Sequence, residues 1–404
     1  MKRSLAFVLP ILALAACSDQ DPVAPAAAPA VAAQPGRYIV VMKDGSFDGP
    51  SYSISGEITD MARAVAAKPS FVYNTVVQGF AAELTEAQLT SLRADPRVAY
   101  VEPDAEVRLF TTQANPISWG LDRIDDVNLP LDQTYTYTAT GAGVNAYILD
   151  SGINLNHLDV VGRANYIPNG SNGDFVGDGH GSAADCHGHG SHVAGTVGGT
   201  YSGVAKGVTI WAGRVVNCAG GGNASMVIAG MDWVAANGLK PGVVNMSLGY
   251  GNVTSVRNAA ENLVAAGFTV AVAAGNGNFQ GIPISACNES PANAPNVLTT
   301  GSTTSTDAES SFSNYGPCVD ILAPGSAIYS SDYLVTNQVV TKSGTSMASP
   351  HVAGVAAQYL QNNPTATPAT VNTAIKNAAQ VNTITLHQRS KKNGTPNRFL
   401  FTNY

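Results

Sequence analysis

Residues 144–152 read Val-Asn-Ala-Tyr-Ile-Leu-Asp-Ser-Gly, an apolar run that ends in an acidic residue and a turn. Three further apolar runs follow along the chain, at residues 208–216, 243–248 and 268–274. Continuous apolar runs of this length are typical of strands that are buried on both faces of a parallel sheet. Helices are expected between the runs, at residues 193–197, 224–236 and 255–266. This alternation predicts an α/β fold, with a mainly parallel sheet and helices on both of its faces.

The composition predicts a folded chain with two domains. Of its 404 residues, 45% are apolar and only 12% are charged, which excludes a largely disordered protein. At ~150 residues per domain, the length predicts two folded units. The formal net charge is −7, and lysine and arginine form no tract. Nucleic acid is therefore not an expected partner, because neutralising phosphates requires clustered positive charge.

The first 17 residues resemble an export signal, because a basic start precedes an apolar run that is too short to span a bilayer comfortably. Two cleavage modes remain open. The residues before Cys17 resemble a bacterial lipobox, which would leave the precursor anchored by a lipid on that cysteine. Alternatively, the small residues Ala13 and Ala15 fit ordinary signal-peptidase cleavage. Residues 18–36 are rich in alanine and proline and are expected to form an extended linker.

Residues 37–110 are expected to form a small α+β domain. The expected elements are a strand at 38–41, a helix at 58–67, a hairpin over 71–84 that turns at Gln78 and Gly79, a helix that begins at Thr85, and a strand at 98–102. Thr85 followed by Gln88 predicts a capping box. The order β-α-β-β-α-β is that of a ferredoxin-like fold. A domain of ~70 residues is expected to be only marginally stable alone.

The cysteines predict two disulfide bonds, which an exported chain permits. Cys17 belongs to the signal region, which leaves four cysteines: Cys186, Cys218, Cys287 and Cys318. Four cysteines allow three pairings. We favour Cys186–Cys218 and Cys287–Cys318, each of which closes a loop of about thirty residues and contributes ~3 kcal/mol. Free buried thiols are the alternative.

Three separated motifs carry residues that are suited to nucleophilic chemistry. Asp150 ends the first apolar run, His189 lies in Gly-His-Gly-Ser-His-Val-Ala-Gly at 188–195, and Ser346 lies in Ser-Gly-Thr-Ser-Met-Ala-Ser-Pro-His at 343–351. Each motif alone has a plain structural explanation, such as an aspartate in a turn or a serine that caps a helix. In open α/β sheets, however, ligands bind outside the carboxyl ends of the strands. The three motifs are expected in that region.

Together, the motifs resemble those of the subtilisin-type serine proteases, in particular the proteinase K and aqualysin branch, over about residues 119–403. The resemblance implies a subtilisin-like fold. It also implies that Ser346 is the nucleophile, that His189 is the general base and acid, and that Asp150 orients His189. Serine is a weak nucleophile at neutral pH, so it needs an imidazole to take its proton, and a carboxylate that holds the imidazole in the correct tautomer.

The resemblance further matches Asn276, which ends the sequence Ala-Ala-Gly-Asn, to an oxyanion-hole donor. A turn asparagine before Gly277 is the alternative. An extended peptide substrate is expected to lie between two backbone segments. These segments are Gly220, Gly221 and Gly222 on one side and Ser247, Leu248 and Gly249 on the other. The family usually has glycine where Tyr250 stands, so its phenol is expected to narrow or cover the cleft.

Residues 37–110 resemble the inhibitory propeptide of the same family, so the chain's own propeptide is expected to be an intramolecular inhibitor of the protease domain, residues 111–404. A self-cleaving enzyme must accept its own junction in the cleft. We expect cleavage near Phe110–Thr111, and hence a preference for a large apolar or aromatic residue before the cut. Any lipid on Cys17 would then leave with the propeptide, and the mature domain would not be membrane-bound.

Calcium is the expected cofactor, because four carboxylates crowd residues 122–132 and repel each other unless a hard cation lies among them. They are Asp122, Asp125, Asp126 and Asp132. A solvated acidic loop is the alternative. The resemblance implies a second calcium site at Asp320 with the carbonyls of Pro295 and Val297. A third site at Asp174 or Asp178 is a weaker expectation.

Zinc is a further alternative, because His180, His187, His189 and His192 fall within thirteen residues. No His-Glu-x-x-His pattern accompanies them, and His192 and His351 are expected to be structural.

The function that these patterns predict is that of an exported serine endopeptidase zymogen, monomeric and located outside the cell or in the periplasm. It is expected to hydrolyse proteins with broad specificity at neutral to alkaline pH, where His189 is unprotonated. Two rivals remain. One is a catalytically inactive surface protein that binds peptides in the same cleft. The other is a lipoprotein whose functional part is the domain at residues 37–110.

Overall fold

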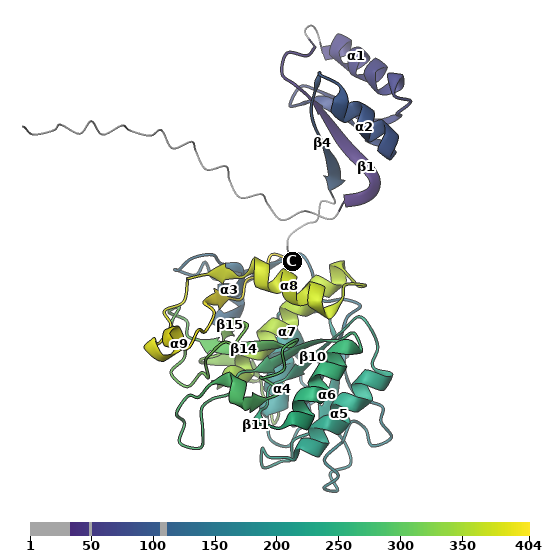
Figure 1. The fold of residues 1–404 in the computed structure, drawn as a ribbon. Coiled ribbons are helices and arrows are strands. Elements are labelled where there is room, and N and C mark those ends of the chain that lie inside the picture. Colours follow the sequence, from purple (N-terminus) through teal and green to yellow (C-terminus); the bar gives the residue numbers. More distant parts are fainter. Residues whose placement is uncertain (1–32, 48–50, 106–110) are drawn as a thin grey trace, which may run out of the picture. The chain divides into compact units, whose positions relative to one another are not determined.

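The computed structural model describes residues 33–47, 51–105 and 111–404 (Figure 1). The described residues form two units, one within residues 1–108 and the other within residues 109–404. Each unit has its own cluster of buried apolar side chains. The predictions on the export signal, Cys17 and Phe110 concern residues outside the described ranges.

The smaller unit is a four-stranded antiparallel sheet with two helices. Its elements are β1 (Ala33–Met42), α1 (Ser51–Ala64), β2 (Pro69–Asn74), β3 (Gln78–Glu83), α2 (Glu86–Ala94) and β4 (Val98–Ala105). The strand order is β2-β3-β1-β4, and all neighbours are antiparallel. Element order and strand order are therefore those of the predicted ferredoxin-like fold. The predicted capping box is also present, because Thr85 and Gln88 each accept from the other's backbone N–H.

The turn predicted at Gln78 and Gly79 is wrong. Both residues belong to β3, and the chain turns earlier, between Asn74 and Gln78. A Cβ on Gly79 would lie 2.1 Å from the carbonyl oxygen of Val40 on the neighbouring strand. Position 79 therefore needs a glycine because β1 passes too close for any side chain, and not because the chain turns there.

The larger unit is built on a nine-stranded sheet. All seven pairs of neighbouring strands from β8 to β19 are parallel. The strands of this sheet are β7 (Asn145–Asp150), β8 (Ala164–Tyr166), β9 (Thr209–Arg214), β10 (Gly242–Met246), β12 (Thr269–Ala273), β14 (Leu298–Thr303), β15 (Ile321–Pro324), β18 (Gln380–Val381) and β19 (Arg398–Phe399). Their spatial order is β18-β19-β15-β14-β12-β10-β7-β9-β8, and β18 alone runs antiparallel to its neighbour. The four apolar runs became the strands β7, β9, β10 and β12, as predicted.

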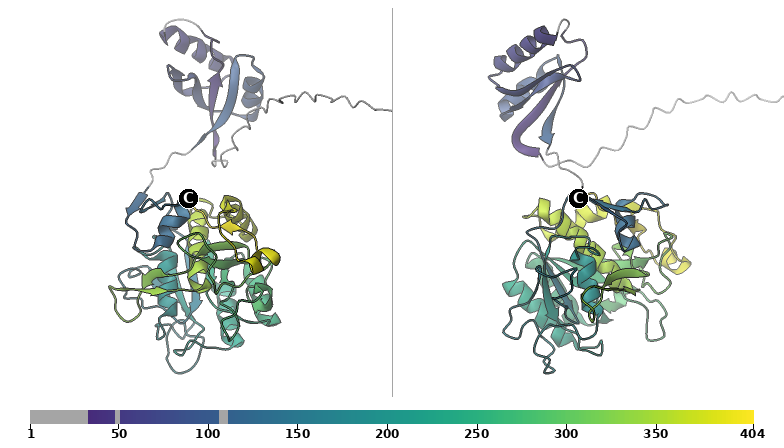
Figure 2. Two further views of the ribbon diagram at one scale, coloured as in Figure 1. Left: turned by 90° about the vertical axis from the view of Figure 1, so that its left-hand side faces the viewer. Right: turned by 180° about the vertical axis from the view of Figure 1, so that it is seen from behind.

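The helices cover both faces of this sheet, which confirms the predicted α/β architecture. The elements are α3 (Trp119–Asp125), α4 (His189–Gly198), α5 (Ala224–Asn237), α6 (Thr254–Ala265), α7 (Thr345–Asn362), α8 (Pro368–Ala378) and α9 (Gln388–Lys392), with the short helix η1 (Ala286–Asn288). Helices α4 and α7 pack on each other, while α5 and α6 form a second pair on the other face (Figure 1). Figure 2 shows the larger unit from two further sides.

Short strand pairs complete the larger unit. They are β5 (Thr111–Ala114) with β6 (Thr134–Tyr137), β11 (Tyr250–Gly251) with β13 (Glu289–Ser290), and β16 (Ile328–Ser331) with β17 (Val339–Lys342). Both favoured disulfide bonds are present, Cys186–Cys218 and Cys287–Cys318. Within the described residues, no helix combines the length and the apolarity that crossing a bilayer requires.

Candidate active site

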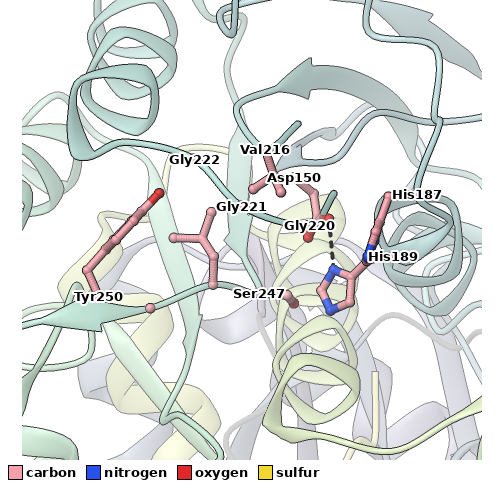
Figure 3. Close-up of a pocket in the computed structure, with 11 residues that line it drawn as sticks. Asp150, His187, His189, Val216, Gly220, Gly221, Gly222, Ser247 and Tyr250 are labelled. Carbon is pink, nitrogen blue, oxygen red and sulfur yellow. Dashed lines mark hydrogen bonds and ion pairs between the residues drawn. The ribbon is translucent and has the colours of Figure 1, made fainter. Parts of the chain in front are cut away.

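The acid and the imidazole of the first two motifs are in direct contact. Asp150 is the last residue of β7 and is only 2% exposed. His189 is the first residue of α4, and its side chain is 25% exposed. Asp150 Oδ1 lies 2.8 Å from His189 Nδ1 and also accepts a hydrogen bond from the backbone N–H of Ser151 (Figure 3). Strand β7 and helix α4 thus bring together residues that are 39 positions apart in the chain.

A glycine permits this contact. A Cβ on Gly190 would lie 2.1 Å from the carbonyl oxygen of Gly152 and 3.2 Å from the Cβ of Asp150. Any side chain at position 190 would therefore push α4 away from the end of β7. Gly190, which follows His189 in the sequence, is thus needed for close packing of the helix start.

Asp185 is a residue of this site that the sequence analysis missed. Its carboxylate accepts hydrogen bonds from the backbone N–H groups of His187, Gly188 and Ser191 and from the hydroxyls of Ser151 and Ser191. It thereby ties the start of α4 to the turn after Asp150. An aspartate a few residues before a helix start is a recognisable cap signal. Ser191 supplies both a backbone N–H and a hydroxyl to this network.

Ser346 lies beside the cleft, near the start of α7, and is 9% exposed. Its hydroxyl donates to the carbonyl oxygen of Ser247 at 3.1 Å, and the hydroxyl of Ser247 donates to the carbonyl of Ser346 at 2.8 Å. The side chain of Ser346 is therefore bonded to Ser247 in this structure and not to His189. Ser247 itself lines the same cleft as His189.

Asn276 follows β12 and is held in one orientation by Thr345. Its Oδ1 accepts hydrogen bonds from the backbone N–H of Thr345 at 2.8 Å and from the Thr345 hydroxyl at 2.9 Å. Because a backbone N–H can only donate, the other amide atom of Asn276 is Nδ2, a donor. A Cβ on Gly344 would lie 3.3 Å from Asn276 Nδ2 and 3.6 Å from the backbone nitrogen of Ser346. The missing side chain of Gly344 therefore leaves a small space that two N–H donors border.

The residues expected to bind substrate line one cleft with the Asp150–His189 pair. The cleft has a volume of about 320 Å³ and is bordered by all six of them: Gly220, Gly221, Gly222, Ser247, Leu248 and Gly249. Tyr250 closes one end, since its hydroxyl would lie 3.7 Å from a Cβ on Gly222 (Figure 3). The phenol thus narrows the cleft between its two backbone segments.

The charges around His189 favour its protonated form. Burial of the ring opposes protonation, but the Coulombic attraction of Asp150 and its hydrogen bond outweigh that effect and raise the pKa of His189 above its ordinary value. Burial lowers the pKa of His192 to about 3 and that of His351 to about 4. Both rings bond to backbone carbonyls, of Ile328 and Met347 respectively, so they are neutral packing residues.

The histidines do not form the alternative zinc site. Among the described residues, the one group of potential ligands that includes a histidine is His180 with Cys186 and Cys218, and these two cysteines form a disulfide bond.

The carboxylates of Asp174 and Asp178, where calcium was a weaker expectation, are paired with a side chain of the chain itself. Both carboxylates form ion pairs with the buried guanidinium of Arg214, which supplies their positive charge.

Three of the four crowded carboxylates form a group that fits a hard cation. The carboxylate oxygens of Asp122, Asp126 and Asp132 lie within 4.8 Å of one another. Asp122 Oδ1 is buried without a hydrogen-bond partner, and burial with the charge of Asp126 raises the pKa of Asp122 to about 6. Asp125 is not in this group, because its Oδ2 accepts from the backbone N–H of Thr136 at 2.7 Å. Asp125 is nevertheless close to the group, and burial and the charges of Asp126 and Asp132 raise its pKa to about 7.

Asp320 has a different partner from the one expected. One carboxylate oxygen lies 3.4 Å from Lys376 Nζ, and the other accepts from the backbone N–H of Thr299 at 3.0 Å. Burial still raises the pKa of Asp320 above its ordinary value. A lysine of the chain itself therefore supplies positive charge at this position.

Comparison with known proteins gives two family matches. Residues 141–400 match the model of the subtilase family, Peptidase_S8, and residues 37–110 match that of peptidase inhibitor I9. "Extracellular serine proteinase" of Thermus sp. (strain Rt41A) is 46% identical over 100% of both chains. "Proteinase R" of Parengyodontium album is 39% identical over 91% of this chain and 89% of its own. The crystal structure of a cold adapted subtilisin-like serine proteinase is 46% identical, with a TM-score of 0.66, and covers 72% of this chain and 100% of its own.

Proposed function

The chain belongs to the subtilase family of serine proteinases and carries an I9 inhibitor segment ahead of its protease domain, and from this we infer that it is an exported endopeptidase made as a zymogen. Its substrates are proteins and peptides, which it hydrolyses with broad specificity. The word "Extracellular" in the name of the Thermus relative supports a site of action outside the cell or in the periplasm. We propose that the mature enzyme acts as a monomer.

The observation that carries this proposal is the 2.8 Å contact between Asp150 Oδ1 and His189 Nδ1 at the edge of a cleft built from two backbone segments. A carboxylate can only accept, so Nδ1 carries the ring proton and Nε2 is left to take another. In the proposed mechanism, Ser346 Oγ leaves the carbonyl of Ser247, gives its proton to His189 Nε2 and attacks the peptide carbonyl carbon. The imidazolium then protonates the leaving amine, and water releases the acyl group by the same route.

Two donors would stabilise the negative oxygen that forms in this attack. We assign them to Asn276 Nδ2 and the backbone N–H of Ser346, which border the space beside Gly344. Such donors act where charge develops, and removing one costs ~10²–10³ in kcat, a value known from subtilisin itself. The extended substrate would pair with the backbone of Gly220–Gly222 and of Ser247–Gly249, where glycines admit close approach.

Covalent labelling tests the proposed function directly. A fluorophosphonate probe is expected to label the purified mature protein once per molecule, to abolish hydrolysis of casein, and to be found by mass spectrometry on the peptide that contains Ser346. A peptide-binding protein without activity would bind substrate and leave the probe unreacted. A lipoprotein that acts through residues 37–110 would lose nothing on labelling, whereas a zymogen predicts that this isolated segment inhibits residues 111–404.

Maturation is expected to cut the chain near Phe110–Thr111. Thr111 begins β5, which pairs with β6 over four residues, so a cut there leaves that pair whole. A large apolar residue would then occupy the cleft before the scissile bond. N-terminal sequencing of the active enzyme is expected to begin at or near Thr111. A start well beyond Asn115 would contradict the proposed junction, because it would remove β5.

We propose a structural calcium ion at Asp122, Asp126 and Asp132, where it would neutralise three adjacent carboxylates and occupy the unpartnered side of Asp122. Chelation with EDTA is therefore expected to lower the melting temperature. At free calcium ~100-fold above Kd, bound calcium contributes about 2.7 kcal/mol, or roughly 4–5 °C for a domain of this size. The measurement is best made on Ser346→Ala protein, so that self-digestion does not contribute.

The neighbouring aspartate provides a matched control for calcium. Asp122→Asn is expected to abolish the EDTA effect, whereas Asp125→Asn removes a carboxylate outside the group of three, one bonded to Thr136, and is expected to keep it. An EDTA-insensitive melting curve in the protein with all four aspartates would contradict calcium binding at this loop.

A further inference from the structure

Glu289 carries a carboxylate that the proposed mechanism does not use. The residue is half-buried at the start of β13. Across the described part of the chain, its side chain makes no hydrogen bond or ion pair, and burial raises its pKa without any offsetting cation. The Glu289 carboxylate therefore has no charge partner among the described residues and is available to pair with a ligand.

This carboxylate lies between two segments that end at the active site. Strands β10 and β12 are parallel neighbours, so their continuations, residues 247–249 and 274–276, leave the sheet side by side. A Cβ on Gly249 would lie 3.6 Å from Glu289 Oε2, and a Cβ on Gly275 would lie 3.6 Å from Glu289 Cγ. Because both positions are glycines, neither segment places a side chain over the Glu289 carboxylate.

In the proposed mechanism, the substrate residue before the cut extends its side chain into the space between these segments. One segment begins at Ser247, which is bonded to Ser346, and the other ends at Asn276, which borders the space for the developing oxyanion. The reacting carbonyl must lie between Ser346 and Asn276, so the side chain on its acyl side enters toward Gly249 and Gly275. Glu289 stands beside both glycines.

The backbone of Glu289 is also held in place. β13 pairs with β11, with Gly251 opposite Glu289 and Tyr250 opposite Ser290. The hydroxyl of Ser290 accepts from the backbone N–H of Val253, which continues this attachment to the cleft segment. A fixed backbone favours a specific role for the carboxylate, since little ordering is needed when a ligand pairs with it.

We propose that Glu289 determines specificity by binding the positive charge of an arginine or lysine placed directly before the scissile bond. This inference rests on the proposed function and widens it, because the same space also takes apolar side chains. A long basic side chain would lay its methylene groups along the backbone of the two glycine segments and bring its charged end to the carboxylate. Hydrogen bonds between two charged groups are among the strongest that proteins make.

Three peptide p-nitroanilides that differ only in the residue before the cut test this role. They carry arginine, citrulline and phenylalanine, and citrulline keeps the shape of arginine without its charge. The mature wild-type enzyme is expected to favour arginine over citrulline by about 10- to 100-fold in kcat/KM. Glu289→Gln is expected to bring this ratio near one while leaving kcat/KM for phenylalanine unchanged. Asp232→Asn removes an exposed negative charge elsewhere and is expected to leave the ratio unaltered.

Each outcome is decisive. A wild-type ratio near one, or a high ratio that persists in Glu289→Gln, would overturn the role of Glu289 while hydrolysis of the phenylalanine substrate still upholds the proposed function. Failure to cleave any substrate or to react with a fluorophosphonate would overturn the proposed function itself. Should Glu289→Gln fail to fold, the wild-type ratio and competitive inhibition by benzamidine, a small aromatic cation, decide the question.

Discussion

Replacing Ser346 with alanine is expected to abolish proteolysis and to leave the chain as an unprocessed precursor. The substitution removes only one oxygen atom, from a side chain that is 9% exposed, so the fold should persist. Without this hydroxyl no acyl-enzyme can form, and the expected loss in kcat is about 10⁶-fold, as in subtilisin. The residual rate would come from substrate binding and from the oxyanion donors. Hydrolysis of a peptide p-nitroanilide and gel analysis of the secreted chain measure both effects.

A second serine provides the control for this experiment. Ser311→Ala removes an exposed hydroxyl on the same unit and is expected to keep both processing and fluorophosphonate labelling. Labelling that survives Ser346→Ala would show that another residue is the nucleophile. The melting curve of Ser346→Ala should remain cooperative, which separates loss of chemistry from loss of fold.

Replacing Asp150 with asparagine is expected to reduce kcat by about 10⁴-fold with little change in the fold. The asparagine amide would donate to His189 Nδ1, so the ring proton would move to Nε2, and that nitrogen could not accept the proton of Ser346. Asp150 is 2% exposed and its Oδ1 receives both His189 Nδ1 and the N–H of Ser151, so its orientation is well defined. The rate should be expressed per molecule of protein that melts cooperatively, which excludes misfolded protein.

The pH profile supplies an independent readout of the same contact. His189 must be neutral to act as a base, so activity falls as the pH drops through its pKa. Burial lowers this pKa and Asp150 raises it, with a net increase, so the acid limb of kcat/KM in the wild type is expected above the ordinary histidine value of 6.5. In Asp150→Asn burial and the charge of Lys342 still lower this pKa and only the weaker attraction of Asp185 raises it, so the limb should move to lower pH. Asp232→Asn should leave the limb in place, and an unmoved limb in Asp150→Asn would contradict the assigned role.

The sequence predicted the central strands well and the later ones not at all. Strands β7, β9, β10 and β12 are buried on both faces, and valine, isoleucine and alanine make this visible as apolar runs. Strand β14 is equally buried, yet it reads Leu-Thr-Thr-Gly-Ser-Thr. Three of its four hydroxyls find partners inside the fold, such as Ala292 for Thr299, so polarity in the sequence did not mean exposure.

The sequence likewise predicted some contacts of the candidate sites and missed others. The sequence identified Asp150 and His189 as partners, and the structure joins them. It also grouped Asp125 with the calcium carboxylates and expected calcium at Asp320, and it did not reveal that Asp125 accepts from Thr136 or that Asp320 pairs with Lys376. Closeness in sequence does not decide which way a carboxylate points, and no local pattern reveals a lysine 56 residues away.

The sequence by itself determined the layer architecture, the two disulfide bonds and the residue types that the proposed chemistry requires. These follow from hydrophobic periodicity and from short motifs, which are local properties of the chain. Only the tertiary structure decided that Asp185 holds the start of α4, that Tyr250 narrows one end of the cleft and that Glu289 lies half-buried beside Gly249 and Gly275. Each of these depends on how segments from different strands pack together, and packing is set by the whole fold and not by the neighbours along the chain.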